Sequence, residues 1–276
     1  MRTYKSVIDE GKDTFELKNI IEVYEETAAI KMQKIREEIL MSREYYRSLG
    51  KLADEVGSDL QVVAAGAYQD AAVFLSANAG MYGDIIGKTF NLFLDFIKKN
   101  LVDLYVVGKE GEEMMRNYAP DFKFITLYLS DDTIEEDALG IVIKRLLEYR
   151  KVFLFYGKFQ NIATQSAETM RVSPELLPKT EKNWQELKKK RLDYLYEPSV
   201  EAVSAVFAKE ILSALMAQVF AEAQLAKFGS RLMFLDESLE KIDDRLADVL
   251  IEKRSLKKKL MDRKQNTMIS GIMARE

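Results

Sequence analysis

The feature that most constrains this fold is a heptad repeat toward the C-terminal end of the chain. From residue 225 to residue 260, seam positions follow one another in alternating steps of three and four, and ten of the eleven are apolar. They are Leu225, Phe228, Leu232, Leu235, Leu239, Ile242, Leu246, Val249, Lys253, Leu256 and Leu260. This spacing predicts a left-handed coiled coil, in a helix from about residue 200 to the end. A helix of an ordinary bundle stays open as the alternative.

A second long helical pattern lies near the N-terminal end. Between about residues 14 and 57, apolar residues recur mostly in steps of three and four. They are Leu17, Ile21, Tyr24, Ala28, Met32, Ile35, Ile39, Tyr46, Leu49, Ala53 and Val56. Such a helix would be roughly 65 Å long, and neither long helix can cover its apolar stripe alone. If the two pair with each other, they pair antiparallel, because one enters and the other leaves the segment between them.

The segment between the two long helical patterns has a different residue pattern. Short apolar runs occur at 71–77, 103–108, 122–129 and 151–157, and each predicts a buried strand. Helical faces separate them, one at Ile86, Phe90, Phe93 and Ile97 and another at Ile134, Leu139, Ile143 and Leu147. The stretch NIATQSAETMRV could add a strand, and 179–191 reads as an exposed connection. Alternating strands and helices predict a parallel sheet flanked by helices.

The expected fold is therefore a Rossmann-like α/β domain with a mostly parallel sheet, at the base of a long antiparallel two-helix coiled coil. The expected divisions are a helix in 1–60, the α/β base domain in 61–192 and a second helix in 193–276.

Composition excludes several kinds of chemistry. The chain has no Cys and no His, which removes disulfides, thiol nucleophiles, imidazole bases and the usual metal ligands. A net charge of −4 argues against a general nucleic-acid binder. The first residues lack the apolar core of a signal peptide, and no run of 18 apolar residues predicts a membrane span. The expected compartment is the cytoplasm.

One motif raises the question of nucleotide binding. Residues 80–90 read GMYGDIIGKTF, and Gly87-Lys88-Thr89 matches the end of a phosphate-binding loop. The motif needs a glycine five residues before Gly87, where this chain has Tyr82. A bulky residue resists the backbone angles that such a loop requires. Gly80 and Gly83 are instead interpreted as a strand-to-helix turn, with Lys88 solvated. An enzyme with a site of this kind remains the third hypothesis.

Several stretches together resemble the gamma subunit of F-type ATP synthases. They are AAIKMQKIR at 28–36, MSREYYRSL at 41–49, FLSANAGMYGDI at 74–85, YLYEPSVEAV at 194–203, RLM at 231–233 and ISG at 269–271. The resemblance implies the central rotor shaft of the complex, which couples rotation driven by a membrane ion ring to conformational change in a catalytic hexamer. The implied partners are the alpha and beta subunits of the hexamer, the epsilon subunit and the c-ring. It also implies no catalytic residue, cofactor or metal, and a peripheral place on the cytoplasmic side of the plasma membrane.

By position, the resemblance carries hexamer-coupling contacts over to Arg231, Lys257 and Lys258, and the turn of the base domain to Gly80 and Gly83. The family has Arg where Lys257 stands and Gln where Lys258 stands, and Ala77-Asn78-Ala79 departs from its Ser-Asp-Arg. Arg and Lys are not equivalent in bidentate contacts, because only the guanidinium of Arg offers two parallel N–H donors. Two alternatives to a standard rotor therefore stay open. One is a gamma-like paralogue in a repurposed F-type-like ATPase, and the other is a structural coiled-coil adaptor.

Overall fold

The computed structural model describes residues 2–56, 69–131, 136–173, 197 and 200–273. These residues form two units. The sheet unit comprises residues 30–231, and the helix-pair unit comprises the residues up to 29 together with those from 232 onward. Both long helices contribute to both units. The expected domain boundaries near residues 60 and 192 lie outside the described residues and stay predictions.

The two long helices predicted from periodicity are present. Helix α1 spans Tyr4–Val56 and helix α6 spans Val200–Met273. In the helix-pair unit they run antiparallel, as their ion pairs show. Arg2 contacts Glu252 at 3.1 Å and Lys18 contacts Asp243 at 2.6 Å, so rising numbers in α1 meet falling numbers in α6. The antiparallel pairing expected from the sequence is confirmed there.

The predicted seam of α1 is wrong at two positions. Leu17 and Tyr24 are 47% and 49% exposed, whereas the neighbouring Lys18 and Glu25 are half-buried. At these two positions the face toward α6 is shifted by one residue, while Ile21 and Ala28 stay at least half-buried, and Lys18 reaches Asp243 across the pair. A lysine can occupy such a position because its alkyl stem packs on apolar surface while its ammonium stays at the edge. Counting apolar residues alone missed this.

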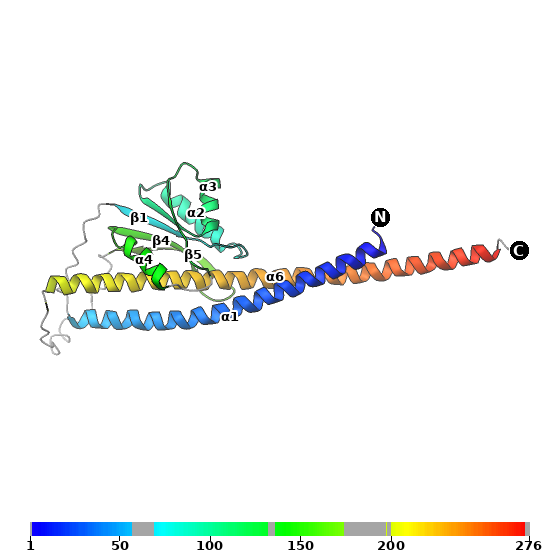
Figure 1. The fold of residues 1–276 in the computed structure, drawn as a ribbon, viewed down its shortest axis with the longest axis horizontal. Coiled ribbons are helices and arrows are strands. Elements are labelled where there is room, and N and C mark those ends of the chain that lie inside the picture. Colours follow the sequence, from blue (N-terminus) through cyan, green and yellow to red (C-terminus); the bar gives the residue numbers. More distant parts are fainter. Residues whose placement is uncertain (1, 57–68, 132–135, 174–196, 198–199, 274–276) are drawn as a thin grey trace. The chain divides into compact units, whose positions relative to one another are not determined.

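A five-stranded sheet organises the sheet unit (Figure 1). Its strands are β1 (Asp70–Leu75), β2 (Asp103–Val107), β3 (Ile125–Leu127), β4 (Lys151–Phe159) and β5 (Gln165–Val172), in the order β3-β2-β1-β4-β5. Only β5 is antiparallel to its neighbour. The mostly parallel α/β sheet is therefore confirmed, including the additional strand. The run predicted at 122–129 forms a shorter strand than expected.

Helices cover both faces of this sheet. Helix α2 (Ile85–Ile97) and helix α3 (Lys109–Tyr118) pack on one face, while α4 (Glu136–Leu146) and α6 pack on the other. Successive strand residues alternate between the two cores, as in β1, where Val73 faces α4 and α6 and Phe74 faces α2. The predicted helical faces at 86–97 and at Leu139 and Ile143 are buried as expected. Ile134 lies outside the described residues.

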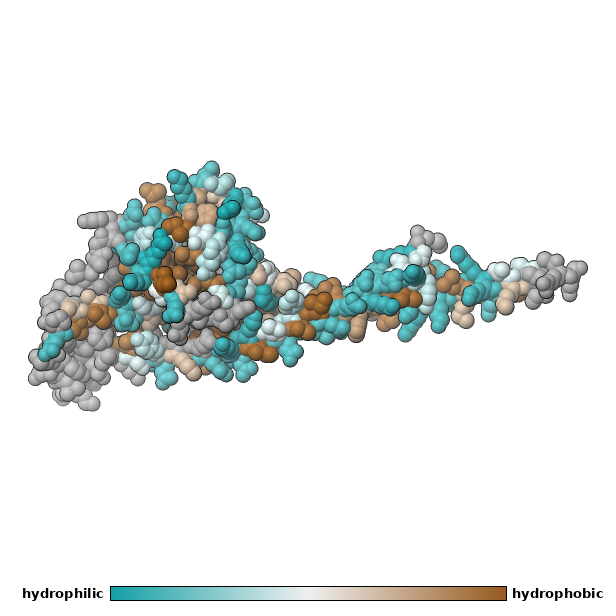
Figure 2. Space-filling model, viewed as in Figure 1, coloured by the Kyte–Doolittle hydropathy of each residue, from teal (hydrophilic) through white to brown (hydrophobic). Residues whose placement is uncertain are grey.

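The surface of the long helices carries both polar and apolar side chains (Figure 2). Within the helix-pair unit, large apolar side chains are exposed on both helices. Those of α1 are Phe15, Leu17, Ile20, Val23 and Tyr24, each roughly half exposed or more, and those of α6 include Leu250, Ile251, Met261, Met268 and Ile269. No helix in the described part of the chain is long and apolar enough to cross a membrane.

Candidate functional site

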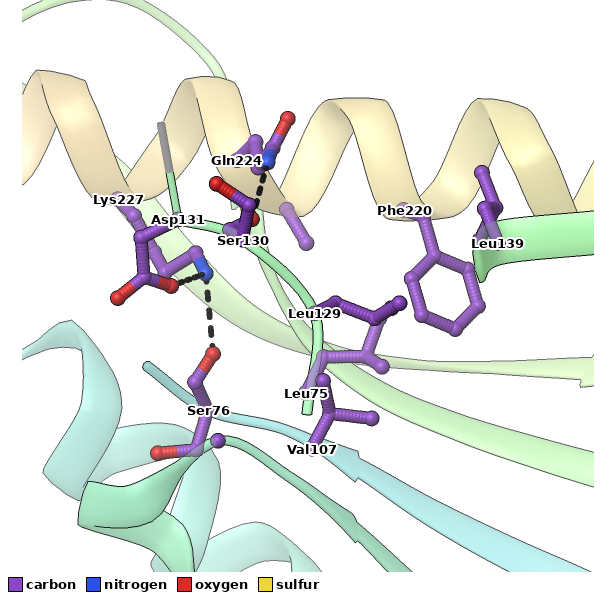
Figure 3. A pocket seen from close by; sticks show the side chains of 12 residues that line it. Leu75, Ser76, Val107, Leu129, Ser130, Asp131, Leu139, Phe220, Gln224 and Lys227 are labelled. Atoms are coloured by element: carbon purple, nitrogen blue, oxygen red, sulfur yellow. Dashed lines mark hydrogen bonds and ion pairs between the residues drawn. The ribbon is translucent and has the colours of Figure 1, made fainter. Parts of the chain in front are cut away.

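The candidate site of the sheet unit lies where α6 crosses the carboxyl ends of β1, β2 and β3. Ligands of open α/β sheets bind at this edge, so it is the first place to look for a cofactor. A cavity is present there (Figure 3). Its lining residues are Leu75, Ser76, Val107, Gly108, Leu129, Ser130, Asp131, Leu139, Phe220, Ala223, Gln224 and Lys227. At about 40 Å³ it is roughly a tenth of a typical ligand pocket, and it suits one or two waters better than a cofactor.

A side chain of α6 enters this edge of the sheet. Lys227 extends from the helix and its Nζ lies 2.8 Å from Asp131 Oδ1 and 3.0 Å from the carbonyl oxygen of Ser76. Both charged side chains are about nine-tenths buried. Asp131 Oδ2 in turn accepts hydrogen bonds from the backbone N–H groups of Asn78 and Ala79. A buried charge pair of this kind is tolerated because each partner is also hydrogen-bonded elsewhere.

A neighbouring carboxyl group is less well satisfied. Glu110 Oε2, in the first turn of α3, is buried and has no hydrogen-bond partner among the described residues. Burial raises the pKa of Glu110, and the negative charges of Asp131 and Glu113 raise it further, while Lys227 opposes them. Among the residues that line the cavity, the charged ones are Asp131 and Lys227, and these two pair with each other. The lining therefore offers no unpaired cation to an anionic ligand such as a phosphate.

The loop from residue 76 to residue 84 holds both predicted turn glycines, and their surroundings differ. Gly83 has φ +57°, and a Cβ built on it would lie 2.7 Å from Ser230 Oγ. Glycine is favoured there both for the backbone angle and for the close approach of α6. A Cβ on Gly80 would meet nothing within 4 Å. The carbonyl oxygen of Gly80 accepts a hydrogen bond from Arg231 at 3.0 Å.

Arg231 is engaged within its own chain. Its guanidinium lies 4.1 Å from the centre of the Tyr82 ring, in the geometry of a cation–π contact. The Tyr82 ring is itself almost fully buried. Lys257 and Lys258, by contrast, are exposed residues of α6 in the helix-pair unit. The structure thus describes no common site for these three residues, and their role as hexamer contacts stays a prediction.

The nucleotide-binding motif has an ordinary structural role. Helix α2 begins at Ile85, so Lys88 lies in its first turn, where it is exposed and pairs with Asp84 at 2.6 Å. Tyr82 stands where a phosphate loop needs glycine, and it is a core residue. The prediction that Lys88 is solvated is confirmed. Over the residues that the structure describes, no cluster of three or more potential metal ligands occurs either.

Sequence reasoning missed the residues that hold α6 against the sheet. Lys227, Ser230 and Asp131 were not singled out, although a signal for Lys227 exists. It is a lone lysine in a stretch of α6 from 219 to 229 whose described side chains are otherwise nearly all buried. A charged residue inside such a stretch implies a buried partner, but the sequence does not indicate that this partner is Asp131.

Comparison with known proteins places this geometry in context. The family model described as ATP synthase matches residues 5–261. The chain is 21% identical to an ATP synthase gamma chain of Ruthia magnifica, over 92% of this chain and 93% of that one. Its fold is similar to a rotor chain of the Euglena gracilis mitochondrial ATP synthase, with a TM-score of 0.63 at 14% identity, covering 94% and 98% of the two chains. A central-stalk chain of the Tetrahymena thermophila enzyme gives 0.56 at 15% identity, covering 79% and 99%.

Proposed function

The chain belongs to the ATP synthase gamma-chain family, and from this membership we propose that it is the central rotor shaft of an F-type ATP synthase or ATPase. Gamma chains are in general non-catalytic subunits. In this role the chain would couple rotation driven by a proton- or sodium-transporting c-ring to conformational change in a hexamer of alpha and beta subunits. The epsilon subunit would be a further partner. The complex would be bound to the cytoplasmic side of the plasma membrane, with this subunit peripheral.

The observation that carries this proposal is the exposed apolar face of α1. Ile20, Val23 and Tyr24 are 53%, 62% and 49% exposed, on a helix whose other side already packs on α6. A soluble chain rarely leaves neighbouring large apolar side chains open to water unless a partner covers them. An enclosing ring of subunits supplies such a cover, and it can hold a different face of the helix in each state.

Lys257 and Lys258 are the proposed coupling contacts on α6. Both are exposed, and they lie in a basic segment that contains Lys253, Arg254 and Lys259. Exposed lysines suit an acidic partner surface and steer association more than they add affinity. Since the family has Arg and Gln at these two positions, a gamma-like paralogue in a repurposed ATPase is the second candidate.

The experiment is purification of the tagged chain from its native cell, with the masses and copy numbers of its partners measured. One copy held with three copies each of two ATPase subunits supports the rotor. The co-purifying base subunits then distinguish a synthase from a repurposed motor. A homodimer, or a complex without ATPase subunits, rejects the proposal and leaves the coiled-coil adaptor.

A second measurement tests the proposal that the chain has no catalytic activity of its own. The highly purified subunit is expected to hydrolyse no ATP. Turnover by the isolated chain, lost on the substitution Lys88→Ala, would instead support an enzyme with its own nucleotide site.

A further inference from the structure

One face of α6 donates hydrogen bonds to main-chain carbonyl groups of the sheet unit. Gln224, Lys227, Ser230 and Arg231 follow one another in steps that place them on the same side of a helix. Each donates to a different carbonyl group: Gln224 to Ser130 at 3.0 Å, Lys227 to Ser76 at 3.0 Å, Ser230 to Tyr82 at 2.7 Å and Arg231 to Gly80 at 3.0 Å. These four residues, together with Asp131, are called the α6 latch below.

The partners of the latch are themselves fixed. Asn78 donates through Nδ2 to the carbonyl of Leu129 at 2.5 Å and accepts from the backbone N–H of Lys109 at 3.2 Å. Its own N–H and that of Ala79 bind Asp131. The loop after β1 is thereby tied to the segment after β3 and to the start of α3. The carbonyl groups that the latch binds therefore belong to segments that are themselves held in place by hydrogen bonds.

The latch defines the rotation of α6 in a way that apolar packing does not. Leu212, Met216 and Phe220 also hold the helix to the sheet, but contacts between apolar side chains have little directional preference. Turning α6 by one residue, about 100°, would remove the Lys227 ammonium from Asp131 and leave the buried carboxylate with its backbone N–H donors but without its cationic partner. Directional hydrogen bonds and a buried charge pair therefore favour one angular position (Figure 3).

We propose that the α6 latch fixes the axial rotation of α6 on the sheet and passes torque from the sheet unit into the helix, with Lys227, Asp131 and Arg231 as positioning residues. The torque step rests on the proposed rotor function, whereas the fixed rotation is a property of the chain alone. Arg231 thereby acts inside the chain, on Tyr82 and Gly80, and its coupling role does not require contact with the hexamer.

The first test measures rotation in the isolated full-length chain. Because the chain has no cysteine, Cys introduced at Glu210 on α6 and at Asn91 on α2, both exposed, carries a pair of spin labels without background. We expect one narrow distance distribution in the parent chain and a broadened or shifted one in Lys227→Met/Asp131→Asn. The matched control is Lys99→Met, an exposed lysine of the same unit. An unchanged distribution in the double variant overturns the fixed rotation.

The double variant also separates positioning from stability. Lys227→Met alone leaves the Asp131 charge buried, and the folding equilibrium constant is expected to fall at least a hundredfold. Asp131→Asn in the same chain removes that charge and is expected to restore at least tenfold of the loss. The ion pair between residues 227 and 131 stays absent in the double variant. Recovery of both stability and the narrow distance distribution would show that the pair only fills space.

The second test uses the assembled complex and the ratio of ions pumped to ATP hydrolysed. In Lys227→Met/Asp131→Asn we expect hydrolysis to persist while the ratio falls at least twofold, with Lys99→Met unchanged. An unchanged ratio in an assembled double variant overturns the torque step. If the parent chain binds no ATPase subunits, the rotor proposal fails, and the spin-label result still decides the fixed rotation.

Discussion

Replacing Gly83 with alanine tests the loop geometry most sharply, because Gly80 supplies a control three residues away. Gly83→Ala places a Cβ in a left-handed backbone conformation, which costs about 1 to 2 kcal/mol. It also brings that Cβ to 2.7 Å from Ser230 Oγ, so Ser230 must release the Tyr82 carbonyl, at about 1 kcal/mol. Reduced freedom of the unfolded chain returns roughly 0.4 to 1 kcal/mol. The expected net loss of unfolding free energy is about 2 kcal/mol.

The assay is urea unfolding of the full chain followed by circular dichroism, with Gly80→Ala measured in parallel. A Cβ on Gly80 meets open space and its φ lies outside the left-handed range, so we expect a change within about 0.5 kcal/mol. Equal costs at the two glycines would refute the reasoning. So would a Gly83→Ala variant that loses nothing, because both the strain and the close approach would then be absent.

Three further perturbations have defined outcomes. Since folding raises the pKa of Glu110, the folded chain holds that proton more tightly than the unfolded chain, and the unfolding free energy falls as pH rises from about 4.5 through the folded pKa. Glu110→Gln should therefore be more stable than the parent at pH 7. In urea titrations, the difference in unfolding free energy between the two chains should disappear at pH 4. Phe93→Ala, at a fully buried ring packed on two others, should cost about 3 to 5 kcal/mol in the same assay. Arg245→Ala removes one of the two cationic partners of Glu10, the other being Arg2, and should speed amide hydrogen exchange in the first turns of α1 at low salt.

Each of these three predictions can be contradicted by a specific result. A Glu110→Gln chain less stable than the parent at pH 7 would mean that the carboxylate has a favourable partner. A small loss for Phe93→Ala would mean that the core around α2 relaxes into the space. An exchange difference that persists in 1 M salt would mean that Arg245 acts through packing rather than charge.

How far the sequence predicts this fold depends on the kind of interaction. The strands β1, β2 and β4 were predictable because they are buried on both faces and read as short apolar runs. The alternation of helices between them then implied parallel pairing. β3 was overestimated because the residues around Ile125 are apolar yet partly exposed at the sheet edge. Burial, rather than composition, decides where that strand ends.

The seam of α1 and the α6 latch were not predictable for a shared reason. In both, a lysine lies next to a predicted apolar position rather than on one, and its partner is far away in the sequence. Lys18 meets Asp243, and Lys227 meets Asp131. Residue patterns within one helix carry no information on which distant acid will face it. The approximate place of the Gly80–Gly83 turn was predictable, whereas the reach of α6 into it was not.

The composition of the helix-pair unit also bears on how the protein is made. Glu252 follows its partner Arg2 by 250 residues, so this ion pair cannot form until those residues have been synthesised. At typical rates of translation that takes roughly 10 to 50 s. All five strands of the sheet unit have left the ribosome earlier, because β5 ends at Val172. Throughout this interval the newborn α1 exposes both its seam and its outer apolar face. A chaperone or an early partner that covers this first helix would shorten its exposure to water.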